Sequence, residues 1–202
     1  MDGSKLDDNN NNMIIDLIKA KGTVCAVDIK KTGIARTTLH YMAKRGILRR
    51  VARGVYTLAG QYLAFEAFAE VMTSAPRSVI CLLSALQFHE ITTQMPYETW
   101  VAIESNASKP KSPNVRIVKL TGKAFSEGIE THEKEGLSVR VYCPAKTVVD
   151  CFKFRNKIGI DVACEALVDC LKQKKATRDE IWKYAKICRM TNVMRPYLEM
   201  SK

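Results

Sequence analysis

The sequence predicts an α+β protein in which an N-terminal winged helix-turn-helix is followed by a mixed α/β C-terminal domain with a small sheet and terminal helices. Two short helical segments and two short β-like runs follow one another before residue 60, which is the order of a winged helix. Alternating segments in the middle of the chain and helical apolar spacing in its last third predict the rest. We expect three regions: a flexible tail at 1–12, the winged helix-turn-helix at 13–60 and the C-terminal domain at 61–202.

The first predicted helix follows a polar start. Residues 1–12 end in four asparagines, a composition typical of a flexible tail. Apolar residues then recur at helical spacing at Met13-Ile14 and Leu17-Ile18, and the helix is expected to stop at Gly22.

The next two predicted helices form the helix-turn-helix. A short helix from Ala26 to Lys31 meets a turn at Thr32-Gly33, and a second helix runs over 36–45. Gly46 closes this second helix, because glycine readily adopts the left-handed conformation found just past helix ends. Leu39, Met42 and Ala43 share one face and are expected to pack inward.

Two short β-like runs, 47–51 and 54–58, follow and are joined across 52–54. They predict a small hairpin with arginines at its tip. A helix that fits the major groove beside a basic hairpin that reaches phosphates is typical of DNA-binding proteins. A solvated charged face is the alternative interpretation of the same pattern.

Beyond residue 60 the pattern predicts a mixed domain. We expect helices at 61–74 and 79–89, the second one buried, and strands at 99–103, 115–120 and 137–142, with a Pro-rich loop between the first two. Helices are expected at 144–155, 161–173, 178–189 and 192–199. Thr177 and Glu180 predict a capping box for the third of these.

Charge supports a polyanionic partner for the N-terminal part. The net charge is +11, and residues 1–60 carry 11 Lys and Arg against 5 Asp and Glu, whereas 61–150 carry 9 against 10 and 151–202 carry 12 against 6. We predict base-edge contacts by Arg36, Thr37 and His40, and phosphate contacts by the remaining cations and Tyr41. The predicted DNA-binding set is Arg36, Thr37, His40, Tyr41, Lys44, Arg45, Arg49, Arg50 and Arg53.

The sequence gives weaker support for other kinds of functional site. Seven cysteines without a C-x-x-C pair indicate reduced, buried thiols in the cytoplasm, with no metal or other cofactor. No apolar run is long enough to span a bilayer. A nuclease core of Glu98, Glu104 and Lys109 is a remote alternative, since the spacing is loose. Basic clusters at 153–157 and 172–178 suit helix solvation, a second DNA contact or an acidic partner protein.

Four stretches of the chain resemble the AbiEi family of bacterial antitoxins: TGIARTTLHYMAKRGILRRVARGVYTL, LLSALQFHEI, VYCPAKTVVDCFKFRNKIGIDVACEALVDCL and YAKICRMTNVMRPYLE. These are transcriptional regulators of abortive-infection, type IV toxin–antitoxin operons. The resemblance implies a repressor that binds inverted repeats in its own promoter, with its DNA-reading helix at Arg36–Arg45 and its wing at Arg49–Tyr56.

The resemblance also implies a C-terminal domain needed to counteract a nucleotidyltransferase-like toxin, and no catalytic motif. Whether the toxin is bound directly stays open, so a module that caps the partner protein is an alternative. The oligomeric state is open as well: two monomers on adjacent repeats or a weak dimer both fit.

Overall fold

A computed structural model of the chain describes residues 3–92, 96–110 and 114–200. It contains 51% helix and 20% strand, which confirms the predicted α+β class. The chain divides into two compact units, Met1–Pro76 with His132–Val139, and Arg77–Thr131 with Arg140–Lys202. We predicted a boundary at residue 60, so the N-terminal unit is larger than expected and is completed by a distant segment of the chain.

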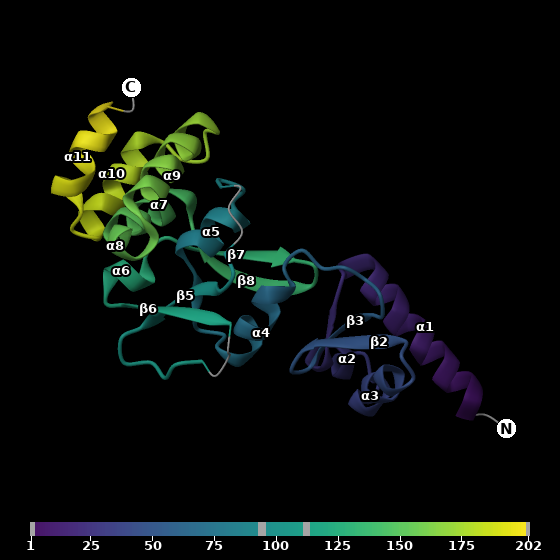
Figure 1. Ribbon diagram of the computed structural model, residues 1–202. Coiled ribbons are helices and arrows are strands. Elements are labelled where there is room, and N and C mark those ends of the chain that lie inside the picture. Colours follow the sequence, from purple (N-terminus) through teal and green to yellow (C-terminus); the bar gives the residue numbers. More distant parts are fainter. Residues whose placement is uncertain (1–2, 93–95, 111–113, 201–202) are drawn as a thin grey trace. The chain divides into compact units, whose positions relative to one another are not determined.

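The N-terminal unit is a winged helix-turn-helix followed by one further helix (Figure 1). Its small sheet is antiparallel in the order β1-β3-β2. Its core is built from one face each of the first three helices, including Ile14, Ile18, Ile29, Leu39 and Met42, all at most 1% exposed. The elements are α1 (Gly3–Lys21), β1 (Val24–Cys25), α2 (Ala26–Lys31), α3 (Arg36–Lys44), β2 (Leu48–Ala52), β3 (Val55–Leu58) and α4 (Glu66–Ser74).

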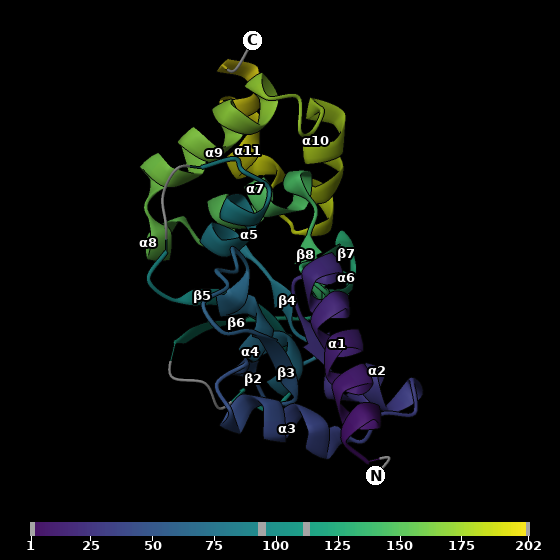
Figure 2. The same cartoon turned by 90° about the vertical axis from the view of Figure 1, so that its right-hand side faces the viewer.

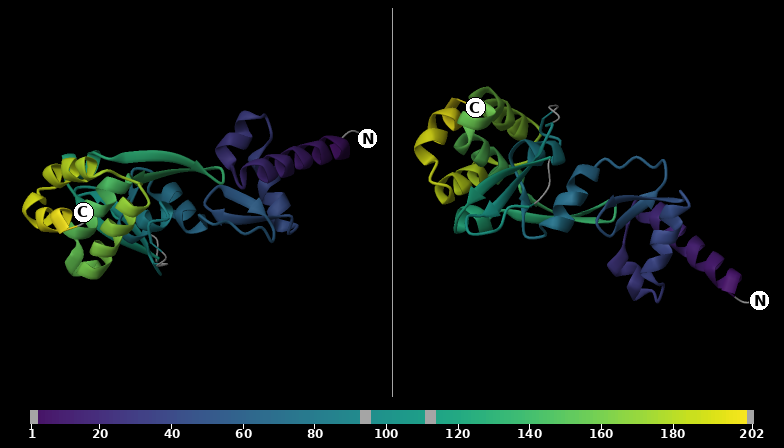
Figure 3. Two further views of the ribbon diagram at one scale, coloured as in Figure 1. Left: turned by 90° about the horizontal axis from the view of Figure 1, so that it is seen from above. Right: turned by 60° about the horizontal axis from the view of Figure 1, so that its bottom comes forward.

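Helix α1 is longer than predicted. It begins at Gly3, so residues 3–12 are helical where we expected a flexible tail. In Figure 3 this part of the helix extends beyond the small sheet of its unit. Asparagine has a weak helix propensity, which is why composition indicated a tail. Once the apolar turn at Ile14–Ile18 has formed, however, each added residue contributes a backbone hydrogen bond without a new nucleation cost.

Strand β1 and the start of α4 also differ from the sequence prediction. β1 is two residues long and pairs with β3 through Val24↔Tyr56 and Cys25↔Val55. Two residues are too few to show alternation, so no sequence pattern indicated it. Helix α4 begins at Glu66 rather than at residue 61, because backbone groups of Gln61, Ala64 and Phe65 bond to side chains of other elements.

The C-terminal unit is built around a five-stranded mixed sheet in the order β6-β5-β4-β8-β7. In the C-terminal part of the unit, helix α7 contacts α9, α10 and α11, and α10 contacts α11 (Figure 2). The elements are β4 (Val79–Ile80), α5 (Leu82–Phe88), β5 (Thr99–Glu104), β6 (Val115–Leu120), α6 (Lys123–Ser126), β7 (Ile129–Lys134), β8 (Leu137–Tyr142), α7 (Pro144–Lys153), α8 (Arg155–Ile158), α9 (Ile160–Lys172), α10 (Arg178–Ile187) and α11 (Thr191–Met200).

Most predicted elements of this unit are confirmed. The strands at 99–104, 115–120 and 137–142 and the terminal helices lie where the patterns placed them, and Thr177 and Glu180 form the capping box. The segment 79–89 is corrected: it begins with strand β4, whose Ile80 pairs with Val101 and Val141. A short central strand is apolar on both faces and cannot be told from a buried helix by periodicity. Strand β7 was missed because four of its six residues, IETHEK, are charged or His.

A buried ion pair lies within α7. Lys146 and Asp150 are 0% and 1% exposed and bond to each other one helical turn apart. The Lys146 ammonium also lies 4.1 Å from the ring centroid of Tyr142, and the Cys188 thiol is 3.8 Å from the second carboxylate oxygen of Asp150. Burial raises the pKa of Asp150, and the Lys146 ammonium opposes that rise.

Candidate nucleic-acid interface

Helix α3 has one apolar face and one polar, basic face. Leu39 and Met42 are 0% exposed and anchor α3 to the core, as the sequence predicted. On the opposite face, Arg36, Thr37, His40, Tyr41 and Lys44 are all exposed. An α-helix with side chains fits the width of the DNA major groove, so this face has the size and chemistry to read base edges.

The turn before α3 sets its direction. Gly33 adopts a positive φ of 83°, a conformation that costs glycine little. The Thr32 hydroxyl donates to the carbonyl of Ile29 at 2.7 Å and so closes the end of α2. Ala35 stands at the N-cap of α3 without a side-chain hydrogen bond, which leaves the first N–H groups of α3 without a side-chain cap from that residue. Helix N-termini with such N–H groups suit phosphate contacts.

Arg45 follows α3 directly and turns back along it. Its guanidinium carbon lies 5.4 Å from the ring centroid of Tyr41, within range of a cation–π contact. Tyr41 itself is 55% exposed. The pair presents a stacked cation and a phenol hydroxyl beside the basic face of α3, a combination suited to phosphate oxygens.

The wing presents two further arginines. Strands β2 and β3 pair from Leu48↔Leu58 to Ala52↔Val55, with a bulge between Arg50 and Ala52. Arg50 and the tip residue Arg53 are exposed, and Gly54 completes the turn at a φ of 77°. A bulge increases the local twist of a strand and redirects side chains, so Arg50 is exposed while Ala52 faces inward, and the Arg50 Nε donates to the Ala52 carbonyl at 3.2 Å.

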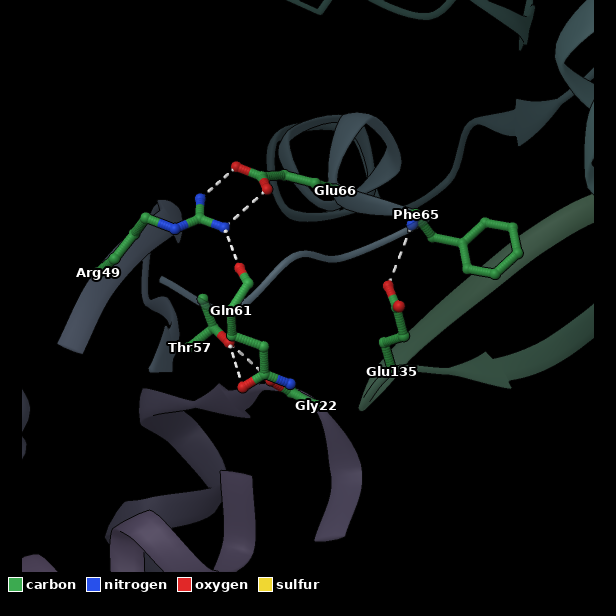
Figure 4. Close-up of polar contacts among 7 residues, drawn as sticks. All are labelled: Gly22, Arg49, Thr57, Gln61, Phe65, Glu66 and Glu135. Atoms are coloured by element: carbon green, nitrogen blue, oxygen red, sulfur yellow. Dashed lines mark hydrogen bonds and ion pairs between the residues drawn. The ribbon is translucent and has the colours of Figure 1, made fainter. Parts of the chain in front are cut away.

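Arg49 differs from its wing neighbours. It is half-buried and donates from Nη1 and Nη2 to the two carboxylate oxygens of Glu66, at 2.5 and 2.9 Å, and from Nη2 to the carbonyl of Gln61 at 3.0 Å (Figure 4). This bond lowers the pKa of Glu66 below its usual range. We predicted a phosphate contact for Arg49, but its donors face its own chain, so the structure favours a role in holding the wing against α4.

The long-range partners around Arg49 were not foreseen from the sequence. Gln61 and Glu66 lie 12 and 17 residues from Arg49, and Glu135, which bonds to the backbone just before Glu66, lies 70 residues from Phe65. No spacing rule joins residues this far apart. The only local signal is the Glu135-Gly136 pair directly before the alternating segment 137–142, which is compatible with a two-residue hairpin turn.

The charge around α3 and the wing is uniform. Between Asp28 and Glu66 the sequence contains no Asp or Glu, although it contains Lys30, Lys31 and all the predicted DNA-binding cations. A solvated helix face usually mixes both signs of charge, because opposite charges three or four residues apart stabilise the helix. The single sign therefore favours a polyanion over simple solvation.

The residues of the alternative nuclease core are not brought together. Glu98 precedes β5 and lies 3.6 Å from the guanidinium of Arg116, whereas Glu104 is the last residue of β5. The strand rise places these two carboxylates about 20 Å apart. Lys109 is exposed in the loop after β5. Within residues 3–92, 96–110 and 114–200, no group of three or more His, Cys, Asp and Glu is placed to hold a metal ion.

The C-terminal basic clusters lie at helix ends and in the turn between α9 and α10. Lys172, Lys174 and Arg178 line a hollow of about 660 Å³ together with the apolar Val168 and Leu171. Val168 is 55% exposed. The seven thiols are free and lie buried or half-buried, in agreement with the prediction of apolar surroundings. In the part of the chain that the structure describes, no helix combines the length and the apolar character needed to cross a membrane.

Comparison with known families agrees with the N-terminal geometry. Residues 12–59 match the family described as transcriptional regulator, AbiEi antitoxin. The matched segment runs from the second half of α1 to the end of β3 and thus contains the helix-turn-helix and the wing. This match confirms the AbiEi resemblance for the helix-turn-helix and the wing, whereas the three C-terminal stretches of the resemblance lie outside the matched residues. No curated protein matches the chain.

Proposed function

We propose that this chain, whose residues 12–59 match the AbiEi antitoxin regulators, is a DNA-binding transcriptional repressor that acts as an antitoxin. The observation that carries the proposal is the exposed face of α3, which is basic, adjoins a basic wing in the same unit and lies in a stretch without any acidic residue. Such an arrangement supplies both groove reading and phosphate binding. The proposed site of action is the cytoplasm, and the proposed role is regulatory rather than catalytic.

The residues take different roles in this proposal. We assign base-edge contacts to Arg36, Thr37 and His40, which are exposed on the first turns of α3, and arginine is the usual bidentate reader of guanine. Phosphates are assigned to the side chains that flank this part of α3. They are Tyr41, Lys44, Arg45, Arg50 and Arg53, all of them exposed.

The description of the matched family supports a proposal for the target and the partner. We propose that the protein binds inverted repeats in its own promoter and represses the operon, as a monomer on each repeat or a weak dimer. The antitoxin description of the matched family supports a toxin as functional partner. The proposed toxin is nucleotidyltransferase-like.

The proposal is tested by a mobility-shift titration of the full chain against its own upstream DNA, beside scrambled DNA of equal length at matched salt. We expect binding to the upstream fragment at a concentration at which the scrambled fragment stays free, since specific sites are typically bound about 10³-fold or more tightly than non-specific DNA. Equal, weak binding to both fragments would show that the positive charge is generic and would overturn the repressor assignment.

A second candidate function is direct capture of an acidic toxin by the C-terminal unit. The hollow bordered by Lys172, Lys174 and Arg178 beside exposed Val168 favours it, because apolar contact and positive charge meet there. Co-expression with the neighbouring gene product tests this function. A complex that survives gel filtration would support capture, and separate elution at micromolar concentration would exclude it.

A further inference from the structure

The tip of the β7–β8 hairpin is an integral part of the DNA-binding unit. Residues His132–Val139 group with Met1–Pro76, although the chain before and after them belongs to the other unit. The two strands are joined by Glu135 and Gly136, with φ of 50° and 76°. Positive φ at both central residues is the geometry of a tight type I′ hairpin turn.

This turn is seated closely against the connection between α1 and β1. The Thr23 hydroxyl donates to the backbone carbonyl of Glu135 at 2.7 Å. A Cβ atom on Gly136 would lie 2.6 Å from the Thr23 carbonyl oxygen, and one on Gly22 would lie 3.0 Å from Cβ of Glu135. Contacts this short leave no room for the hairpin turn to shift against the α1–β1 connection, so the position of Glu135 in this unit is well defined.

The Glu135 side chain binds the start of α4. One carboxylate oxygen accepts the N–H of Ala64 at 2.9 Å, and the other accepts the N–H of Phe65 at 3.0 Å. Figure 4 shows the bond to Phe65. Phe65 is the N-cap of α4 and has no side-chain cap of its own. The carboxylate therefore satisfies backbone donors at this helix end and also interacts favourably with the helix dipole. The Lys134 ammonium lies 5.8 Å from the Phe65 ring centroid and adds a second contact from the same hairpin.

The next residue of α4 holds the wing. Glu66 follows Phe65 and accepts two bonds from the Arg49 guanidinium, one on each carboxylate oxygen, in the bidentate geometry that fixes direction as well as distance. Arg49 precedes Arg50 in β2, the strand that leads to the tip residue Arg53. In the described part of the chain β2 is an outer strand of its sheet, bonded to β3 on one side. Helix α4 also contacts β2 and is bonded to it through Glu66 and Arg49.

We propose that Glu135 is a positioning residue for DNA binding: it fixes the first turn of α4, through which Glu66 and Arg49 hold the wing where Arg50 and Arg53 meet phosphates. This inference rests on the proposed function. Three consecutive residues, 64–66, make all four of these bonds. The N–H groups of Ala64 and Phe65 bind the Glu135 carboxylate, and the Glu66 carboxylate binds the Arg49 guanidinium twice. A wing held in advance loses less conformational entropy on binding DNA than a mobile one.

The sign of the effect separates positioning from simple electrostatics. Glu135 is acidic, so removing its charge from a basic DNA-binding unit would by Coulomb attraction alone tighten binding to a polyanion. The positioning role requires the opposite result, since a displaced wing loses phosphate contacts.

The experiment compares Glu135→Gln with Glu133→Gln in the full chain. Glu133 lies in the same hairpin, is exposed and carries the same charge, so it is a matched control. We expect Glu135→Gln to bind upstream DNA on the order of tenfold more weakly and with a salt slope lower by about one, the loss of roughly one phosphate contact. Glu133→Gln should bind as tightly as the wild type or slightly more tightly.

A double-mutant cycle tests the route. If Glu135 acts through the wing, Arg53→Ala should cost much less affinity in the Glu135→Gln background than in the wild type. Additive effects of Glu135→Gln and Arg53→Ala would overturn the proposal, as would equal binding by Glu135→Gln and Glu133→Gln. If circular dichroism shows that Glu135→Gln is unfolded, Glu66→Gln decides by the same criteria. A wild-type protein that does not prefer its upstream DNA would instead refute the proposed function itself.

Discussion

Replacing Arg53 with alanine should reduce the salt dependence of DNA binding by a defined amount. Four exposed cations are assigned to phosphates, Lys44, Arg45, Arg50 and Arg53. Each neutralised phosphate releases counterions, so four contacts give a slope of log K against log salt of about −3.6 for each protein chain on DNA. Affinity should then fall about 150-fold between 50 and 200 mM salt.

Without Arg53 three phosphate contacts remain, so the slope of log K against log salt becomes about −2.7. Affinity should then fall only about 40-fold over the same salt range. Arg53 suits this test because it is exposed at the tip of the wing, next to Gly54, where truncation leaves no buried group without a partner. The assay is a fluorescence-anisotropy titration of labelled upstream DNA at four or more salt concentrations. Loss of affinity should be similar for all DNA sequences, because phosphates carry no sequence information.

Lys19→Ala is the matched control. Lys19 is exposed and loses the same charge, but it lies on α1, outside α3 and the wing. An unchanged slope in Arg53→Ala would refute the placement of the wing on the DNA backbone. An equal change in both variants would show that the protein senses net charge rather than specific phosphate contacts.

Three further results are expected. Arg36→Ala should cost about 1–3 kcal/mol of operator binding and relax specificity at one base position, measured on operators with single base changes; a uniform loss on all sequences would assign Arg36 to a phosphate instead. Glu66→Gln should lose about 0.5–1 kcal/mol of stability at pH 7, because the partner Arg49 is only half-buried. Since Arg49 lowers the pKa of Glu66, this contribution is complete above about pH 4.3 and disappears as pH falls through the lower folded-state pKa, which unfolding by urea at several pH values would check. Lys146→Met should destabilise the protein by about 3–5 kcal/mol at pH 7 by leaving Asp150 buried without its partner, whereas Lys146→Met with Asp150→Leu should be nearly neutral. Because burial already raises the pKa of Asp150, the penalty of the single variant should shrink as pH falls below that raised pKa, where the carboxyl is neutral.

Local sequence patterns were sufficient for the elements that the proposed function uses most. The apolar spacing of Leu39 and Met42 defined which face of α3 is buried, and therefore which residues are exposed to solvent. Glycines at 33 and 46 marked the helix ends and have positive φ in the structure. Such signals act over a few residues, through backbone conformation and side-chain periodicity, so they are readable before any tertiary contact is known.

Sequence patterns did not predict the elements that are very short or rich in charged residues. Strand β1 has two residues and is held by pairing with β3, which lies far away in the sequence, whereas strand β7 is rich in charged side chains and is held by pairing with its hairpin partner β8. Residues 3–12 were misassigned for the opposite reason, since their composition disfavours a helix that the neighbouring apolar turn propagates. In each case a cooperative or long-range interaction outweighs the local preference.

The division of roles among the wing arginines shows where tertiary structure was needed. Arg49, Arg50 and Arg53 are chemically identical and lie within five residues, and their basic, acid-free surroundings point to a polyanion from sequence alone. Only the folded chain brings Glu66 and the carbonyl of Gln61 to Arg49, and Glu135 to the backbone beside them. Which arginine faces solvent and which is held by its own protein depends on these long-range contacts, and a long-range contact leaves no periodicity in the sequence from which to read it.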